Sequence, residues 1–394
     1  MADDVVITGL GIVSPIGCCE ARFWDSLSEG RPGASPVDCL DTTRLSRKTA
    51  CQIHEPIEVG SGLGRASQLT IAASRQAVAS AGLAPAETPG QGLAVIIGTT
   101  MGETDFIEER LDAPSEQWLC PEHMRRICGG RPGCIARNVQ ADLGGQGLAM
   151  DLYGACAAGN MAVATARRHL LDGHCDVVLA GGTDGFSRLA FIGFMRLRVM
   201  AAEVCRPFDR ERDGLLVGEG AAVFVLERES SARARGATVR ARVAGCSMTC
   251  ESYHPTRPEP DGDGLTRATH GALRDAGLQA AEIDYVCAHG TGTPQNDAIE
   301  IKILERCFPK GVPFSSIKAL TGHTMGAAAA LETACCLLSL EQQTLIPTWH
   351  LRDMLEPCSS DAIRGAVRPA RVRHALNNSA GFGGYNSSII LTAA

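Results

Sequence analysis

The sequence predicts an α/β fold built from two related halves, and two kinds of pattern support that prediction. Short apolar runs rich in valine and isoleucine, which are typical of buried strands, alternate with longer helical patterns along the chain. Three glycine- or alanine-rich motifs of the first part of the chain also recur, in the same order, in the second part. One such match could arise by chance, but three in register indicate a duplicated architecture.

The predicted elements follow one another without a low-complexity linker. The strand-like runs cover residues 5–8, 93–97, 148–153, 177–180, 222–226, 285–288 and 388–391. The helical patterns cover residues 66–81, 161–171, 265–276 and 327–340. We therefore divide the chain into a first half, residues 1–240, which carries insertions, and a second half, residues 241–394.

The composition is that of an ordinary folded protein and argues against several classes of function. Of the 394 residues, 45% are hydrophobic and 21% are charged, and the formal net charge is −7. This acidic balance disfavours a nucleic-acid binder or a protein held on a membrane surface. No apolar run approaches the length of a transmembrane helix, and the opening residues, MADDVVITGLG, do not resemble a signal peptide. We therefore expect a cytoplasmic protein.

One of the 17 cysteines stands out by its context. The cysteines are scattered without a C-x-x-C pair, so the sequence predicts no metal site and no disulfide framework. Cys156, however, follows the predicted strand at 148–153 and precedes an alanine-rich helix. A helix N-terminus favours the thiolate, lowers the pKa and makes the sulfur nucleophilic. The competing interpretation is a small buried core residue, which is the usual role of a free cysteine.

The repeated motifs contain the other candidate reactive residues. The segment GACAAGNMA around Cys156 matches GHTMGAAAA around His323, and in each a glycine follows the reactive residue by three positions. IIGTTMG matches AHGTGTP, which contains His289, and GEGAAVFVL matches GFGGYNSSIIL. We therefore expect His323 to occupy a helix start that corresponds to that of Cys156.

Each histidine lies where the predicted fold places reactive groups. His289 ends a predicted strand before a glycine-rich turn, and α/β proteins gather their sites at the carboxyl ends of strands. A loop histidine bonded to the backbone is the competing interpretation there. His323 should be neutral, because a helix N-terminus disfavours a cation, and a neutral imidazole can donate an N–H to an oxyanion.

Six motifs together resemble those of the β-ketoacyl synthases of the elongating, decarboxylating type. They are VVITGLGIVSPIG, GACAAG, RPFDRERDGLLVGEGAAVFVLE, HGTGTP, IKALTGHTMGAAAALE and NNSAGFGGYNSSIIL, and they span nearly the whole chain. The resemblance implies a thiolase-like fold of five layers, α-β-α-β-α, with two pseudo-repeated halves. It also implies a homodimer in which the strand at 148–153 pairs across the two-fold axis.

The resemblance also implies roles for the reactive residues. Cys156 would take the acyl chain as a thioester. His289 and His323 would hold the thioester carbonyl of a malonyl unit and stabilise the enolate left after loss of CO2. The backbone N–H groups of Cys156 and Phe382 would form the oxyanion hole, which is a large term in catalysis of this kind.

Supporting residues follow from the same motifs. Lys318 and Glu332 match a buried pair that orders the site, for which an ordinary structural ion pair is the competing interpretation. Thr291 and Thr293 would bind the pantetheine arm of an acyl carrier protein, so no further cofactor is expected. Phe382 would be a gate on a loop that glycines allow to swing. These glycines are Gly381, Gly383 and Gly384.

Departures from the family pattern suggest a specialised pathway, such as polyketide or secondary lipid synthesis. Gly292 stands where the family usually has serine or asparagine, Ala380 where it has phenylalanine, and Tyr385 where it has threonine. The last two would alter the pocket beside the gate.

Basic residues that could dock the carrier protein are also rearranged. The stretch 55–69, often rich in lysine and arginine, holds one basic residue. We expect docking at the cluster of Arg125, Arg126 and Arg131 and at Arg206, although an exposed arginine cluster is commonly only solvated surface.

Two other functions are compatible with parts of the pattern. One is an acyltransferase or hydrolase on the same scaffold, which would use Cys156 without decarboxylation. The other is a non-catalytic subunit, similar to a chain-length factor, that shapes the cavity of an active partner. The intact set of one cysteine and two histidines favours the condensing enzyme over both, and leaves open a heterodimer with a chain-length-factor-like partner.

Overall fold

The computed structural model describes residues 3–60, 62–84, 92–112, 114 and 131–394. The strands within these residues form one 11-stranded sheet and two two-stranded sheets. The large sheet has two parts, one from each half of the chain. The parts join where β1 (Val5–Val13), the first strand of the first part, pairs over two residues with β8 (Ala241–Cys250), the first strand of the second.

The first part of the sheet has the strand order β1, β7, β6, β4, β5. The strands after β1 span Gly220–Arg228, Val177–Asp184, Leu93–Thr99 and Ala149–Tyr153. β7 is antiparallel to both β1 and β6, whereas β4 is parallel to both β6 and β5. The four strands other than β5 are almost wholly buried, which explains their nearly continuous runs of apolar and small residues.

The second part has the order β8, β15, β14, β9, β10, followed by the short β12. The strands after β8 span Tyr385–Ala393, His374–Gly381, Tyr285–Cys287, Pro313–Ser315 and Asp361–Ala362. β15 is antiparallel to both β8 and β14, whereas β9 is parallel to both β14 and β10. The same order of pairings therefore occurs twice, which confirms the two pseudo-repeated halves.

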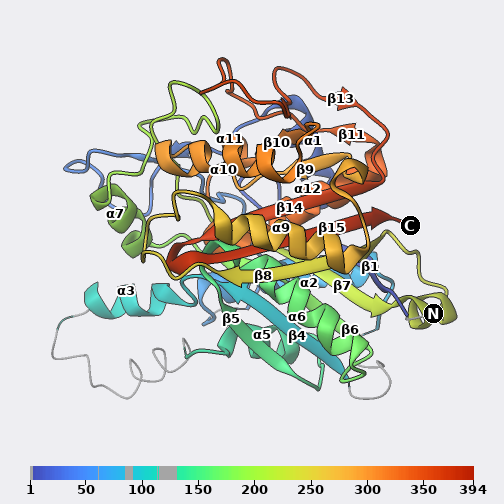
Figure 1. The fold of residues 1–394 in the computed structure, drawn as a ribbon. Coiled ribbons are helices and arrows are strands. Elements are labelled where there is room, and N and C mark those ends of the chain that lie inside the picture. The colour runs from blue at the N-terminus through green and yellow to red at the C-terminus, as the bar shows by residue number, and fades with distance from the viewer. Residues whose placement is uncertain (1–2, 61, 85–91, 113, 115–130) are drawn as a thin grey trace.

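Six helices complete the layers. In chain order, α2, α5, α6, α9, α10 and α12 span Arg65–Ser80, Cys134–Asp142, Ala158–Leu171, Asp263–Ala276, Pro294–Cys307 and Ala328–Gln342. α2 and α5 cover the outer face of the first sheet part, and α9 and α10 cover that of the second (Figure 1). α6 and α12 lie between the parts and contact each other and strands of both. The predicted α-β-α-β-α arrangement is thus confirmed.

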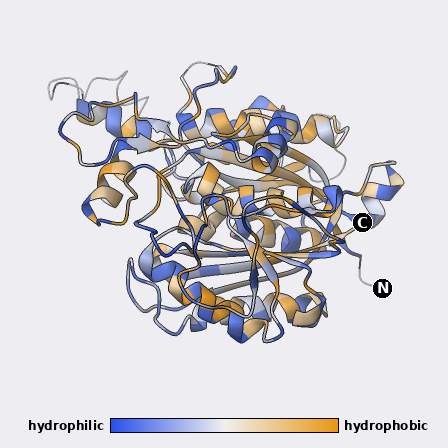
Figure 2. Ribbon diagram, turned by 90° about the horizontal axis from the view of Figure 1, so that it is seen from above, coloured by the Kyte–Doolittle hydropathy of each residue, from blue (hydrophilic) through white to orange (hydrophobic). Residues whose placement is uncertain are grey.

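The middle layer explains the unusual composition of its helices. Every residue from Ala328 to Leu340 of α12 is buried, so the helix has no polar face. The outer helices instead show hydrophilic and hydrophobic residues side by side (Figure 2). Alanine is the most frequent residue of α6 and α12 taken together, and its small side chain helps two helices to fit between two sheet layers.

The remaining elements are short or lie at the periphery. They are α1 (Glu20–Glu29), β2 (Ser35–Pro36), β3 (Thr49–Ala50), α3 (Thr104–Asp112), α7 (Arg188–Arg196), α8 (Glu229–Ala234), α11 (Lys318–Thr321), β11 (Thr344–Leu345) and β13 (Arg368–Pro369). Both chain ends lie on the same side of the molecule (Figure 1). No helix in the described part of the chain is long and apolar enough to cross a membrane.

The structure corrects the register of the first repeated motif. The 3-10 turns η3 (Ala155–Ala157) and η5 (Met325–Ala327) lead into α6 and α12, and each begins at positive φ, 48° at Ala155 and 52° at Met325. Cys156 therefore corresponds to Gly326, not to His323. Matching the motifs by their reactive residues was wrong by three positions, because backbone conformation and not side-chain chemistry is what repeats.

Candidate active site

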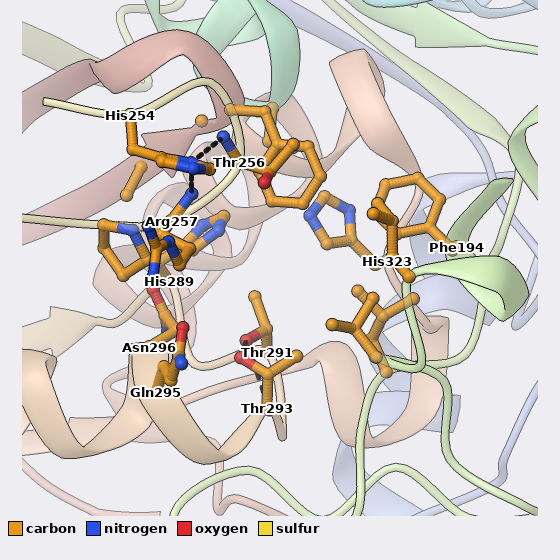
Figure 3. A pocket seen from close by; sticks show the side chains of 18 of the residues that line it. Phe194, His254, Thr256, Arg257, His289, Thr291, Thr293, Gln295, Asn296 and His323 are labelled. Atoms are coloured by element: carbon orange, nitrogen blue, oxygen red, sulfur yellow. Dashed lines mark hydrogen bonds between the residues drawn. The ribbon is translucent and has the colours of Figure 1, made fainter. Parts of the chain in front are cut away.

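A cavity of about 450 Å³ lies at the carboxyl ends of β9 and β14 and is lined by residues of both halves. Cys156, His289 and His323 all line it, so the fold brings together the three reactive residues that the sequence predicts. Figure 3 shows the two histidines among the lining side chains. The gate residue Phe382 and the aromatic side chain of Phe194 also face it.

The position of Cys156 beside the cavity is fixed by its turn and by a hydrogen bond from a neighbouring strand. Cys156 lies in the turn η3 ahead of α6 and is buried. The hydroxyl of Ser379 on β14 donates a hydrogen bond of 3.0 Å to the carbonyl oxygen of Cys156. The backbone N–H of Phe382, a predicted oxyanion donor, lies close enough to the thiol to act on its pKa in the lowering direction.

The structure contradicts the prediction of a lowered thiol pKa. Burial raises the pKa of Cys156 to about 12, although Lys318 and the N–H of Phe382 act in the opposite direction. The sequence shows the helix start but not the depth of burial, and desolvation of the thiolate outweighs the favourable helix end. Cys156 therefore rests as a thiol and must lose its proton during acylation.

His289 follows β9 and is fixed by two acidic residues of α10. Its backbone N–H donates to Glu300 at 2.6 Å, and the next amide, of Gly290, donates to the same carboxylate at 2.7 Å. Asp297, one turn earlier on α10, accepts the amides of Thr291 and Gly292 at 3.0 and 3.1 Å. These two carboxylates hold the whole HGTGTP turn in place.

Sequence reasoning missed both carboxylates. Asp297 is fully buried and Glu300 is 1% exposed, and burial raises the pKa of Glu300 to about 7. Their spacing of three residues on a helix, directly after a glycine-rich turn, was the available signal. Such spacing usually marks a solvated helix face, so only burial reveals the role.

His323 is oriented by backbone groups of its own neighbourhood. Its N–H donates to the carbonyl of Leu216 at 2.7 Å, and its carbonyl accepts the N–H of Gly218 at 2.9 Å. The ring Nδ1 accepts the N–H of Met325 at 3.2 Å. Because Nδ1 is an acceptor, the neutral ring carries its proton on Nε2.

Lys318 joins His289 to the buried carboxylate of Glu332. Its Nζ donates to the carbonyl of His289 at 2.6 Å and contacts Glu332, and both of these charged side chains are 1% exposed. Burial and the charge of Lys318 hold the pKa of both His289 and His323 well below the usual value. The two rings, 5.5 Å apart and nearly perpendicular, are therefore neutral and able to donate N–H bonds.

Thr291 and Thr293 line the same cavity. Their hydroxyls are 2.9 Å apart and hydrogen-bonded, and Figure 3 shows them side by side below the histidines. Gly292 between them has φ 77°, and a Cβ there would lie 2.7 Å from the carbonyl oxygen of Gly214. Glycine at position 292, where the family usually has serine or asparagine, therefore suits the local backbone.

The segment predicted to be a gate has an aromatic contact at Phe382 and two glycines at positive φ. Phe382 stacks on Phe194 with ring centroids 5.5 Å apart, and Gly383 and Gly384 have φ of 83° and 81°. Gly381 is close enough to the nucleophile turn that a Cβ on it would lie 3.1 Å from the amide nitrogen of Cys156. The N–H of Gly383 bonds to the carbonyl of Pro255 at 2.8 Å, which closes the loop against the segment after β8.

The two departures beside the gate differ in position. Ala380 lines the cavity, so its small side chain enlarges the space next to the gate. Tyr385 is 39% exposed and its ring lies against Gly383, outside the cavity. Only Ala380 can therefore contact a bound acyl chain directly.

The predicted docking residues that the structure describes do not line the cavity. Arg125 and Arg126 lie outside the described residues. Arg131 is exposed and Arg206 is half-buried, and neither lines the cavity. Two exposed arginines that the sequence did not single out, Arg198 and Arg257, line its opening instead. Among the described residues, no group of three or more histidine, cysteine, aspartate or glutamate side chains could hold a metal ion.

Comparison with known proteins agrees with this geometry. The family model for the N-terminal domain of β-ketoacyl synthases matches residues 2–232, and that for the C-terminal domain matches residues 240–352. The chain is 32% identical to 3-oxoacyl-[acyl-carrier-protein] synthase 2 of Synechocystis, over 98% of this chain and 97% of the relative. It is 34% identical to the ketoacyl synthase alpha subunit of the tetracenomycin polyketide synthase of Streptomyces glaucescens, over 98% and 96%.

A solved structure gives the same result. A chain of the ishigamide ketosynthase/chain length factor matches with a TM-score of 0.93 and 35% identity over 100% of both chains. The chain described here therefore belongs to the β-ketoacyl synthase family and is an acyltransferase that forms carbon–carbon bonds between acyl units carried by an acyl carrier protein.

Proposed function

We propose that Cys156 carries the growing acyl chain and that His289 and His323 promote the loss of CO2 from a malonyl unit. The observation that supports these roles most directly is the pair of neutral imidazoles facing one cavity with the buried cysteine. Because Nδ1 of His323 accepts a backbone N–H, its Nε2–H is available to an enolate oxygen. Catalysis by such fixed donors suits a reaction in which charge develops on oxygen.

The reaction would proceed in two balanced steps. First, the sulfur of Cys156 attacks the carbonyl of an acyl thioester, the carbon–sulfur bond to the carrier breaks, and the cysteine proton ends on the carrier thiol. Next, malonyl-carrier loses CO2, and the electron pair remains as an enolate held by the two histidines. Its carbon attacks the acyl group on Cys156, whose sulfur leaves and takes up one proton from solvent.

The carrier protein would approach the cavity from the side of Arg198 and Arg257. Carrier proteins of this class are acidic, and two exposed guanidinium groups at the opening offer complementary charge to such a partner. The pantetheine arm would then pass Thr291 and Thr293 to reach Cys156. A type II polyketide ketosynthase of similar structure, at 27% identity, is known in complex with its acyl-carrier protein. We propose no cofactor beyond that arm.

The substrate would be an intermediate of a specialised pathway. The small side chain of Ala380 beside the gate leaves room for an acyl chain that is bulkier than a saturated fatty chain at that position. The tetracenomycin polyketide synthase subunit and the ishigamide ketosynthase/chain length factor, at 34% and 35% identity, are as similar to this chain as the 3-oxoacyl-[acyl-carrier-protein] synthase 2 of Synechocystis, at 32%. We therefore favour polyketide or secondary lipid synthesis over primary fatty-acid synthesis.

A second subunit would pair along β5. This strand is the edge of the large sheet, and Leu148 and Tyr153, at its two ends, are 37% and 46% exposed. An unpaired edge with exposed apolar side chains favours association with another chain. We propose a homodimer, with a chain-length-factor-like subunit as the other possible partner, in a reducing cytoplasm that suits the free cysteines of the described residues.

Release of CO2 from malonyl-carrier tests the proposed function. Wild-type protein should release CO2, and His289→Ala should reduce the rate on the order of 100-fold or more. Cys156→Ala should still release CO2 but form no β-ketoacyl product, as measured by mass spectrometry of the carrier. Wild-type protein that takes an acyl group on Cys156 but releases no CO2 would instead be a simple acyltransferase.

A further inference from the structure

The second half of the molecule contains a counterpart of the nucleophile turn. Cys156 and Gly326 are each the second residue of a 3-10 turn that starts at positive φ and leads into a middle-layer helix. Amides in the first turn of a helix have no acceptor within that helix, so both turns can bind an anion. In the first half, the amide of Cys156 is a predicted oxyanion donor.

In the second half, a side chain of the protein already occupies this turn. Oδ2 of Asp184 accepts the N–H of Gly326 at 2.6 Å and that of Thr100 at 2.8 Å. Oδ1 accepts the hydroxyl of Thr99 at 2.6 Å and the N–H of Met101 at 2.9 Å. Asp184 is fully buried, and its carboxylate joins the loop after β4 in the first half to the start of α12 in the second.

The residue that corresponds to Asp184 is Gly381. Asp184 ends β6 opposite the first residue of β7, and Gly381 ends β14 opposite the first residue of β15. A Cβ on Gly381 would lie 3.1 Å from the amide nitrogen of Cys156. The turn of the second half is thus filled by a carboxylate from the first half, whereas the turn of the first half faces a glycine from the second half, which leaves the amide of Cys156 to the substrate.

Asp184 lies one peptide away from the group that orients His323. The N–H of Met325 holds Nδ1 of His323, and the next N–H, of Gly326, is held by Asp184. A carboxylate that fixes this turn also fixes the donor that sets the direction of the imidazole.

We propose that Asp184 is a positioning residue for the condensation, which acts as a built-in anion in the second-half turn and thereby aims His323 at the malonyl carbonyl. This role rests on the function proposed for His323. An amide cannot replace the carboxylate, because both oxygens of Asp184 accept backbone N–H bonds and the NH2 group of asparagine would face a donor.

The test compares two half-reactions in full-length Asp184→Asn. CO2 release from malonyl-carrier should fall on the order of 100-fold, as expected when a catalytic group is misaimed. Alkylation of Cys156 by iodoacetamide should be as fast as in wild type or faster, because Asp184 contributes to raising the thiol pKa. Asp284→Asn is the matched control, since that carboxylate also accepts two backbone N–H groups but at the far end of β14.

Two further variants, His323→Ala and the double variant of Asp184→Asn with His323→Ala, distinguish the role of Asp184 from the function proposed for the site. If Asp184 acts through His323, Asp184→Asn should add no further loss in the His323→Ala background. Wild-type CO2 release in Asp184→Asn would overturn the inference, as would a parallel loss of alkylation and CO2 release. Unchanged CO2 release in His323→Ala would instead overturn the proposed function. If Asp184→Asn does not fold, Thr99→Val, which removes one donor to the carboxylate, should still lower CO2 release severalfold, and an unchanged rate would refute the role.

Discussion

The two halves of the molecule have the same strand order but use equivalent positions for opposite purposes. At the start of α6, the first half presents Cys156, and the glycine that faces its amide leaves space. At the start of α12, the second half presents Gly326, and Asp184 fills the equivalent space. The duplicated backbone thus supplies two anion-binding turns, of which one is kept for substrate and the other is used to build the site.

This difference explains how chemistry is distributed over a symmetric fold. The first half contributes Cys156, the proposed nucleophile, whereas His289, His323, Lys318 and the proposed gate at Phe382 all come from the second. The second-half turn receives the carboxylate of Asp184, the first-half turn faces Gly381, and the two turns contact each other in the middle layer. Changes that make the two halves more alike should therefore damage the enzyme most.

The largest effect is expected for Gly381→Asp, which copies the second-half arrangement into the first. Its carboxylate would occupy the space beside the amide of Cys156 and compete with the oxyanion, so condensation should fall at least on the order of 100- to 1,000-fold. Product formation is measured by mass spectrometry of the carrier. Gly381→Ala is the control for steric crowding alone, and equal losses in both variants would contradict the electrostatic explanation.

The next effect concerns the buried ion pair of Lys318 and Glu332 in the second half. Lys318→Met leaves Glu332 buried without its partner, which should lower the free energy of unfolding by about 3–5 kcal/mol. The double variant with Glu332→Gln should recover much of that loss. Denaturant unfolding of the three proteins measures both values, and an equally unstable double variant would argue against an unpaired charge as the cause.

The same substitution should move the pH dependence of decarboxylation. Lys318 helps to hold the pKa of His289 and His323 low, so both rings stay neutral in mild acid. Without that positive charge the imidazolium forms become easier to reach, both pKa values rise, and activity is lost at a higher pH than in wild type. Rates of CO2 release measured from about pH 5 to pH 8 give the acid limb. A shift toward lower pH would contradict this sign.

Much of the fold and of the candidate site was predictable from the sequence. The buried strands β4, β6 and β7 have continuous apolar runs, and the motifs around Cys156, His289 and His323 indicate the site directly. β8 and β14 were not predicted, because polar residues interrupt their apolar pattern, as in the run Asn377, Asn378, Ser379. In β14 those residues are buried and face other polar groups of the interior.

The buried carboxylates were not predictable for a different reason. Three of them accept backbone N–H groups of other segments of the chain, and the sequence alone does not place those segments beside them: Asp184, Asp297 and Glu300. An isolated acidic residue is usually on the surface. The high pKa of the Cys156 thiol has the same origin, since a helix start is visible in sequence and burial is not. Topology can be predicted from pattern, but electrostatics requires the packed structure.

A smaller effect is expected for Ala380→Phe, which alters the cavity but changes no residue of the turns η3 and η5. The larger ring should exclude bulky acyl groups from the space beside the gate while still admitting an acetyl group. We expect about a tenfold loss in acylation of Cys156 by bulky acyl-carriers relative to acetyl-carrier. Intact-protein mass spectrometry of competing substrates measures the ratio, and an equal loss for both chain types would show that the position does not select substrates.

The smallest effect is expected at the mouth of the cavity, where charge should affect encounter more than chemistry. Arg257→Glu and Arg198→Glu should each raise the KM for an acyl-carrier severalfold with little change in kcat, because a rim charge mainly changes association. The difference should shrink as salt is added, since exposed charges are screened. Arg206→Gln serves as the comparison, because Arg206 is half-buried and does not line the cavity. A larger, salt-sensitive KM effect at Arg206 than at Arg257 would favour docking at the residue that sequence alone suggested.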